Sequence, residues 1–200
     1  MKSYVFHVSL PGTGRLWRKI EIPAHYTLSH LHYAIQQAFE MHSDHLYSFF
    51  MSGKAWDQNS RYALPEGYPP WSIGEIINLD EVESVLAEAE RQAIEREEEK
   101  KREEEAYIDK MLKFYPDDLP DGVRQQIIDS FFRIPEPPGD VLSTMLGSLG
   151  FKPKQTFLYL YDYGDEHRFK VRVHAIHEDA DPNAEYPRTV EATGRVPTLS

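Results

Sequence analysis

The sequence predicts an α+β protein built on a mixed β-sheet, and three local patterns support that prediction. Apolar residues alternate with polar ones from Tyr4 to Leu10 and again from Leu16 to Ile22, which is the period of a half-buried strand. Pro11–Gly14 between them has the composition of a turn, so the two strands are expected to form a hairpin. Apolar residues then recur at helical spacing over Leu28–Met41, which predicts an amphipathic helix.

Three later segments extend this beginning. Leu46–Gly53 is a strand-like run, so the order is expected to be β-β-α-β, with helices packed on the sheet. Lys54–Trp71 is rich in Pro, Gly, Asn and Tyr and is expected to form a long loop. Asp140 is expected to cap a short helix that runs to Leu149.

A second hairpin is predicted around the acidic turn of YLYDYGDEHRFKVRVH, Tyr159–His174. In its return strand, apolar residues alternate with charged ones from Phe169 to Ala175. The tail from Glu178 has little periodicity and is expected to be a loop that ends in a short ordered segment. One face of the first strand is predicted to carry four aromatic residues: Phe157, Tyr159, Tyr161 and Tyr163.

Residues 80–139 are predicted to be a helical insertion in a single domain formed by residues 1–79 and 140–200. From Asp80 to about Phe114 the chain has no Gly or Pro and helix formers dominate, which predicts a long charged helix. Strong breakers on both sides delimit a second amphipathic helix around Val123–Phe131.

The charge block Glu95–Glu105 in the long helix has two interpretations. It can be a solvated helix face with Glu–Lys and Glu–Arg pairs, which is the usual case for such blocks. It can also be a projecting arm that contacts a protein partner. The sequence predicts nothing about oligomeric state.

Composition limits the function classes. The 22 basic and 33 acidic residues give a formal net charge of −11, which disfavours general binding to a phosphate backbone. The chain has no cysteine, so disulfides, thiolate nucleophiles and cysteine metal sites are excluded. No segment has the roughly 18 apolar residues of a membrane helix, and the N-terminus lacks the apolar stretch of a signal peptide. We therefore expect a cytoplasmic protein without a membrane partner.

The turn YDYGDEH contains the first candidate site. In a structural interpretation, Gly164 adopts a backbone angle that other residues resist, and Asp162 and Asp165 brace the turn. In a functional interpretation, Asp162 and Asp165 are paired carboxylates for a metal ion or for acid–base chemistry. The structural interpretation is favoured, because a perturbed carboxylate pair also requires a cleft.

Histidines form the second candidate site. His32, His42 and His45 could bind a divalent metal together with Asp162 or Asp165. The chain lacks His-Glu-x-x-His and every other spacing that specifies a metal strongly. No cofactor is therefore predicted, and a metal held by His42, His45 and Asp162 is the alternative.

Aromatic and basic residues on the predicted strands suggest two binding surfaces. The first is a stacking platform for bases or a peptide, although such a face more often belongs to the core. Its members would be Tyr159, Tyr161, Tyr47, Phe49 and Trp17. The second is an anion-binding patch, which requires that the basic residues share an open sheet face; the alternative is cross-strand pairing with Glu21 and other carboxylates. Its members would be Arg15, Arg18 and Lys19, together with Lys170 and Arg172.

Several segments, taken in order, resemble the plasmid pRiA4b ORF-3-like family. They are LWRKIEIP (Leu16–Pro23), TLSHLHYAI (Thr27–Ile35), DHLYSF (Asp44–Phe49), YDYGD (Tyr161–Asp165), YP (Tyr186–Pro187) and GRVP (Gly194–Pro197). The resemblance covers roughly residues 3–53 and 140–197 and leaves the helical insertion unmatched. It implies an α+β fold with a mixed sheet and no established reaction. Some members are passengers of insertion elements, so it also implies an association with mobile elements.

The favoured hypothesis is a non-enzymatic binding or interaction module, because no catalytic motif is assembled. The chain has no phosphate loop, no Gly-x-Ser-x-Gly and no dinucleotide fingerprint. One alternative is a metal-dependent hydrolase-like site at His45, Asp162 and Asp165, with His32 as a further member. The other is a nucleic-acid-binding accessory protein that acts through Arg15, Arg18 and Lys19. Whether the protein is an enzyme is left open.

Overall fold

The computed structural model describes residues 1–41, 45–65, 101–102, 106, 110, 120, 122–124 and 137–196. The chain divides into two units, Met1–Ile77 with Pro137–Ser200, and Asn78–Glu136. In chain order, the elements of the first unit are β1 (Ser3–Ser9), β2 (Trp17–Pro23), α1 (Leu28–Ala38), β3 (Tyr47–Phe50), η1 (Gln58–Ser60), β4 (Arg61–Ala63), β5 (Gly139–Asp140), η3 (Leu146–Leu149), β6 (Thr156–Tyr161), β7 (His167–His177) and β8 (Arg188–Thr193).

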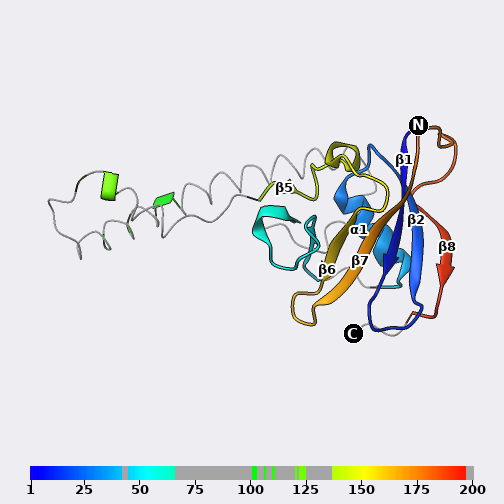
Figure 1. The fold of residues 1–200 in the computed structure, drawn as a ribbon, viewed down its shortest axis with the longest axis horizontal. Coiled ribbons are helices and arrows are strands. Elements are labelled where there is room, and N and C mark those ends of the chain that lie inside the picture. Colours follow the sequence, from blue (N-terminus) through cyan, green and yellow to red (C-terminus); the bar gives the residue numbers. More distant parts are fainter. Residues whose placement is uncertain are drawn as a thin grey trace. The chain divides into compact units, whose positions relative to one another are not determined.

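Within the described residues, eight strands form one sheet in the order β5-β4-β3-β6-β7-β1-β2-β8 (Figure 1). Strands β4 and β5 are parallel and every other neighbouring pair is antiparallel, so the sheet is mixed. The α+β class and the β-β-α-β beginning are confirmed. The β1–β2 hairpin turns at Pro11–Gly14, where Gly12 and Gly14 have φ of 86° and 74°, angles that suit glycine.

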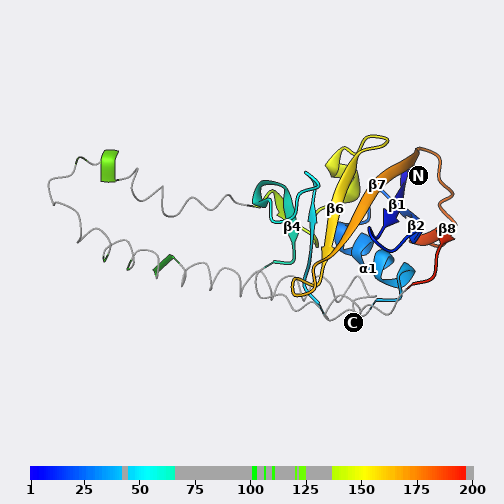
Figure 2. The same ribbon diagram turned by 60° about the horizontal axis from the view of Figure 1, so that its bottom comes forward.

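Helix α1 lies against one face of the sheet, here called the inner face (Figures 1 and 2). Leu28, Leu31 and Ile35 of the helix are fully buried against it, which follows from their helical spacing. The inner face contributes the alternate apolar residues of the strands, because successive side chains of a strand point to opposite faces. Among them are Tyr4, Phe6, Val8, Ile20, Phe157, Tyr159, Phe169, Val171 and Val173.

The segment from β5 to η3 caps the N-terminus of helix α1. The backbone N–H groups of Leu28 and Ser29 donate to the carbonyls of Thr144 (3.0 Å) and Val141 (2.9 Å). These bonds satisfy N–H groups that have no partner within a helix. The start of the helix is therefore fixed by a segment more than 100 residues later in the chain.

The prediction that Asp140 caps a helix to Leu149 is wrong. Asp140 lies in β5, and its Oδ1 accepts from the backbone N–H groups of Leu142 and Ser143 at 2.7 and 2.8 Å. This is the turn that an aspartate favours as readily as a helix cap. The 3-10 helix η3 begins only at Leu146, and Gly150 follows it with φ of 59°.

One further prediction requires correction, because the expected loop Lys54–Trp71 contains η1 and the strand β4. The short ordered segment expected at the end of the tail is the strand β8. Both strands lie near the sheet edges, where one side of a strand has few neighbours and apolar alternation fades. In β8, Arg188–Ala192 are all exposed, so the sequence offered no alternation to detect.

The predicted inserted helices lie mostly outside the described residues. Lys101, Arg102, Ala106, Lys110 and Gly122–Arg124 are helical. The long charged helix, the second helix and the proposed domain boundaries stay predictions. Among the described residues, no helix has the length and apolar character needed to span a membrane.

Candidate functional site

The candidate site is the outer face of the sheet, opposite helix α1. Apart from Arg18, the charged residues of β2, β7 and β8 lie on this face, because apolar residues of β1, β2 and β7 occupy the inner one. Two groups of polar and aromatic residues lie on this face, one at each end of the strands. The Glu21 cluster consists of Ser3, Glu21, His177 and Arg188, and the cationic face consists of His7, Trp17, Lys19, Lys170, Arg172 and His174.

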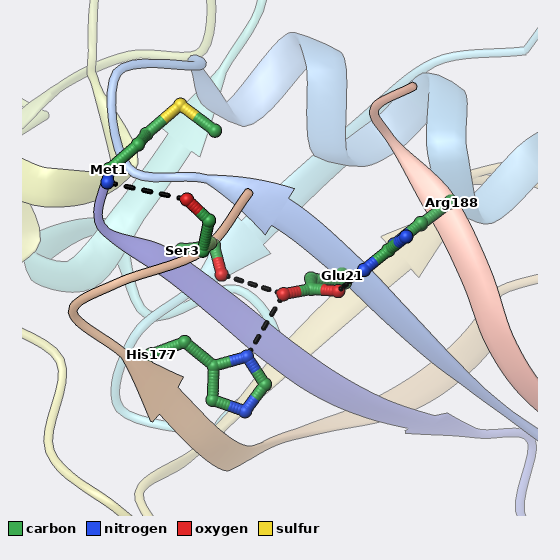
Figure 3. Close-up of polar contacts among 6 residues, drawn as sticks. Met1, Ser3, Glu21, His177 and Arg188 are labelled. Carbon is green, nitrogen blue, oxygen red and sulfur yellow. Dashed lines mark hydrogen bonds and ion pairs between the residues drawn. The ribbon is translucent and has the colours of Figure 1, made fainter. Parts of the chain in front are cut away.

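The Glu21 cluster joins four strands through one carboxylate (Figure 3). Oε1 of Glu21 accepts from Ser3 Oγ at 2.8 Å and lies 2.9 Å from His177 Nδ1. Oε2 accepts from Nε and Nη2 of Arg188 at 3.0 and 2.7 Å. Glu21 is only 3% exposed, so these partners replace the water that a carboxylate needs.

The electrostatics of Glu21 show that its partners outweigh its burial. Burial alone would raise the pKa of this carboxyl. Hydrogen bonds from Arg188, His177 and Ser3 act in the opposite direction, and the pKa of Glu21 lies below its ordinary value. The carboxylate is therefore ionised at neutral pH and belongs to the framework that holds β1, β2, β7 and β8 together.

The cationic face lies across β7, β1 and β2. His7 of β1 is directly opposite Arg172 on one side and Lys19 on the other, and Ser9 is opposite Lys170. The β1–β7 register shifts between Val5 and Phe6, which places His174 in a bulge. Lys170, Arg172 and His174 are exposed, whereas His7 and Lys19 are half-buried.

The cations of this face are only partly neutralised. Lys19 forms an ion pair with Glu191 of β8 at 2.6 Å. Lys170 and Arg172 have no ion pair within the part of the chain that the structure describes. Burial and then the Arg172 charge lower the pKa of His7. Partial desolvation by its neighbours, followed by the charges of Lys19 and Arg172, lowers the pKa of the exposed His174. The two histidines are therefore held neutral beside charged neighbours.

Trp17 adds an aromatic surface beside these cations. Its ring stacks on His7, with centroids 5.0 Å apart and planes inclined by 28°. The Lys19 ammonium lies 5.5 Å from the Trp17 centroid, a cation–π contact. Trp17 is half-buried, so part of the ring stays in contact with solvent at the edge of the cationic face.

Comparisons with known proteins place this chain in a family. The profile of the family described as plasmid pRiA4b ORF-3-like protein matches residues 2–198. The chain belongs to this family. The match extends across the segment 80–139, which the sequence motifs had left unmatched.

Solved structures with a similar fold include the crystal structure of a protein of unknown function from Methanosarcina mazei Go1, with a TM-score of 0.51 and 19% identity. The match covers 96% of this chain and 69% of that chain. At this identity the likeness shows the fold alone. A comparison with curated proteins gave no match.

The YDYGD motif closes the β6–β7 hairpin. Asp162 has φ of 55°, and its Oδ1 accepts from the backbone N–H groups of Gly164 (2.8 Å) and Asp165 (3.4 Å). Its Oδ2 lies 3.3 Å from Nδ1 of His45. Burial would raise the pKa of Asp162, but those backbone hydrogen bonds and then His45 lower it below its ordinary value. Asp165 is exposed, and only its backbone N–H reaches Asp162.

His32 is separated from that hairpin tip by its burial. It is 1% exposed on the inner face, its Nδ1 lies 2.7 Å from the Tyr159 hydroxyl, and its ring stacks on Tyr47 at 3.5 Å. Burial lowers the pKa of His32 to about 3. The structure therefore brings His45 and Asp162 together but leaves His32 in the core. His42 lies outside the described residues.

A metal site finds no support in this arrangement. Among the described residues, no group of three or more His, Asp or Glu side chains is arranged to hold a metal ion. The His45–Asp162 pair supplies two donors; Oδ1 of Asp162 accepts from the backbone N–H of Gly164 in the turn, and Oδ2 faces His45 itself.

Arg18 is separated from the predicted anion patch. It is 7% exposed and points into the inner side of the sheet. Its Nε donates to the Ala38 carbonyl at the end of α1 (2.9 Å), and its Nη1 donates to the Thr193 carbonyl (2.8 Å). Carbonyls at a helix C-terminus suit a buried cation. Arg15 is exposed in the turn before β2, whereas Lys19, Lys170 and Arg172 share the outer face.

The predicted aromatic platform is mostly core. Tyr47, Phe49, Tyr159 and Tyr161 are at most 3% exposed, which leaves Trp17 as its only half-buried member. Tyr163 does not share a face with Tyr161, because the chain turns after Asp162. Its hydroxyl lies 2.5 Å from Ser48 Oγ, on the outer side of the sheet.

Sequence reasoning missed His7, His174, His177 and Arg188 as members of the outer face. A signal existed for the first two. His7 lies between the inward-facing Phe6 and Val8, so strand alternation places it outward. No local signal pointed to Arg188, because β8 itself was not predicted to be a strand.

Proposed function

We propose that this protein is a non-enzymatic binding module that holds an anionic polymer on its cationic face. The observation that supports this proposal is the pair Lys170 and Arg172, exposed on one strand and without carboxylate partners among the described residues. Lys19, His7 and His174 surround that pair. Cations gathered on one open face attract phosphate or carboxylate groups.

The net charge of −11 does not oppose this proposal as strongly as it first suggests. Residues 80–139 carry 18 of the 33 acidic side chains but only 9 of the 22 basic ones. The remaining chain therefore carries 15 acidic and 13 basic residues, close to neutrality. At physiological salt, charges more than about 8 Å apart are largely screened, so the local cations dominate at short range.

A charge-reversal experiment tests the proposal. The probes are fluorescein-labelled oligothymidylate and inorganic polyphosphate, which both carry closely spaced phosphates. We expect both probes to bind, with an affinity that falls steeply as salt is added. The double variant Lys170→Glu/Arg172→Glu is expected to lose at least about tenfold in affinity for both probes, the size of losing two charge-assisted contacts.

The matched control is Lys54→Glu/Lys152→Glu, which changes the net charge equally at two exposed lysines of the same unit that do not belong to the cationic face. It is expected to bind nearly as tightly as the unmodified protein. The proposal is overturned if neither probe binds, or if the control variant loses as much affinity as the Lys170/Arg172 variant.

Three sequence-based ideas stay predictions. A protein partner for the charged segment 95–105 concerns residues that mostly lie outside the described part. A cytoplasmic location and an association with mobile elements also await a direct test. The hydrolase-like alternative at His45, Asp162 and Asp165 gains no supporting observation.

A further inference from the structure

We infer that the polymer bound by the cationic face is a single-stranded nucleic acid. This inference rests on the proposed function and names its ligand. Two features of the outer face support it: a row of cations along β7, and an aromatic stack two strands away. A polyanion without bases would use only the first feature.

The cations of β7 repeat along the strand. Lys170 and Arg172 are two residues apart, so their side chains leave the same face about 7 Å from each other. His174 follows them in the bulge of the β1–β7 pair. A row with this repeat runs parallel to one extended phosphate backbone and contacts successive phosphates of it.

The aromatic stack lies at the side of that row. His7 is on the adjacent strand β1, and Trp17 is on β2, one strand further. Adjacent strands are about 4.8 Å apart, so Trp17 lies roughly 10 Å from the β7 row. This separation allows a nucleotide to place its phosphate over β7 and to stack its base on the exposed part of the Trp17 ring.

The arrangement favours a single strand over a duplex. Bases are available for stacking on a protein aromatic ring only when they are unpaired or at an end. A ring in a flat sheet face does not enter a duplex groove, as a helix does. An acidic peptide would satisfy the cations but would leave the Trp17–His7 stack unused. Glu191 opposes any anion at the β8 side, because it lies on the same face beside Lys19.

The experiment compares four probes by fluorescence anisotropy at one salt concentration. They are single-stranded oligothymidylate, a duplex of the same length, inorganic polyphosphate and polyglutamate. We expect oligothymidylate to bind most tightly. Trp17→Leu is expected to weaken oligothymidylate binding about tenfold, within the range of losing one stacked base. The same variant is expected to leave polyphosphate binding unchanged.

Two variants keep the test sharp. Trp17→Phe retains an aromatic ring and is expected to restore most of the oligothymidylate affinity, which also guards against a folding defect in Trp17→Leu. Tyr33→Leu is the control, because Tyr33 is a 37% exposed aromatic residue on α1, which covers the opposite face of the sheet. It is expected to leave affinity unchanged.

The outcomes separate the two proposals. Binding of polyphosphate or polyglutamate as tightly as oligothymidylate overturns the nucleic-acid inference and leaves the anion-binding proposal standing. Equal loss in Trp17→Leu for oligothymidylate and polyphosphate overturns it in the same way. A duplex that binds better than the single strand also overturns it. If no probe binds, the proposed function itself fails.

Discussion

The charged side chains at the two ends of the outer face differ in their burial and in their partners. At one end, Glu21 is 3% exposed and is bound by Ser3, His177 and Arg188. At the other end, Lys170 and Arg172 are exposed and have no ion pair among the described residues. The same strands, β1, β2 and β7, run through both ends.

This difference separates structural charge from charge that is free to bind. A buried carboxylate requires partners, because desolvation is costly, and its loss leaves those partners unsatisfied. Exposed cations lose little hydration when the chain folds, and they contribute little to its folding free energy. Stability experiments should therefore respond to the Glu21 cluster, and binding experiments should respond to the cationic face.

The largest expected change in the free energy of unfolding comes from His32. This residue belongs to neither end of the outer face and is buried as a neutral ring on the inner face. Its pKa of about 3 lies far below the ordinary value of 6.5. As pH falls below about 6.5, His32 is protonated in the unfolded chain but stays neutral in the folded chain. The free energy of unfolding therefore decreases until about pH 3. The full loss is on the order of 5 kcal/mol, at about 1.36 kcal/mol for each pKa unit between 6.5 and about 3.

Urea unfolding over this pH range measures that decline. His32→Phe is expected to flatten it, whatever the cost of losing the Tyr159 hydrogen bond at neutral pH. The slope, and not the absolute stability, is therefore compared between the two proteins. An unchanged slope would contradict the assignment of the decline to His32.

The next largest change in unfolding free energy is expected from removing Glu21. This change tests directly whether the buried charge stabilises the fold more than the exposed cations do. Glu21→Ala leaves Arg188, His177 and Ser3 without their acceptor and is expected to cost about 2 to 3 kcal/mol of unfolding free energy. The cost stays at the lower end of buried pairs because the Arg188 side chain is 46% exposed and reaches water. Arg172→Ala is the matched control and is expected to change stability by less than about 0.5 kcal/mol.

The pH dependence of the Glu21 contribution has a different window from that of His32. Because its folded pKa is depressed, the contribution is complete above the unfolded pKa of about 4.3 and is lost as pH falls through the lower folded value. Glu21→Gln should therefore cost most at neutral pH and progressively less below about pH 4.3. Equal costs at both ends of the range would show that the charge of Glu21 is not what matters.

Binding should show the opposite pH response, through His7 and His174. In the free protein their pKa values are lowered by desolvation and by Arg172 and Lys19, with Glu191 acting in the opposite sense on His174. A bound anion favours the protonated rings, so protons are taken up on binding and affinity rises as pH falls. We expect oligothymidylate to bind roughly threefold to tenfold more tightly at about pH 5.5 than at about pH 7.5.

The double variant His7→Gln/His174→Gln isolates this effect. It is expected to bind with little dependence on pH. Because His7 also stacks on Trp17, the affinity of the variant at about pH 7.5 is compared with its own affinity at about pH 5.5. The phosphodiesters of the probe do not titrate in this range, so the protein is the source of any change. A variant that keeps the full pH dependence would contradict the role of these histidines.

The smallest expected effect comes from Glu191, which among the described residues is the acidic residue paired with Lys19 of the cationic face. Glu191→Gln releases Lys19 and removes a repulsive charge, so oligothymidylate affinity should rise roughly twofold to fivefold at low salt, the scale of one exposed ion pair. Adding salt should reduce the gain. Weaker binding in this variant would mean that Glu191 supports the bound state.

Much of the fold was predictable because it follows local periodicity. The β1–β2 hairpin, α1, β3 and the β6–β7 hairpin all carry an apolar repeat that matches their structure. Strands β4 and β8 could not be recognised in this way, because pairing with β3 and β2 defines them more than their own side chains do. The capping of α1 by residues 141 and 144 is likewise a long-range contact without a local signal.

The candidate site was predictable in part. The sequence suggested an anion patch of Arg15, Arg18, Lys19, Lys170 and Arg172 on the condition that they share an open sheet face. Strand alternation is sufficient to put Lys19, Lys170 and Arg172 on one face. Arg18 lies between two neighbours that face outward, so the same rule places it inward, among carbonyls that only the folded chain supplies. The Glu21 cluster depends on Arg188, whose position follows from the β2–β8 register and from no motif.

We propose that an anion binds at the cationic face and leaves the Glu21 cluster at the other end of the outer face unchanged. Amide spectra of ¹⁵N-labelled protein, recorded as oligothymidylate is added, test it most directly. We predict the largest shifts at residues 170–174 of β7 and at His7, Trp17 and Lys19, with Glu21 and Arg188 nearly unchanged. Shifts concentrated at the hairpin tip, Asp162–Glu166, or at the Glu21 cluster would contradict the account.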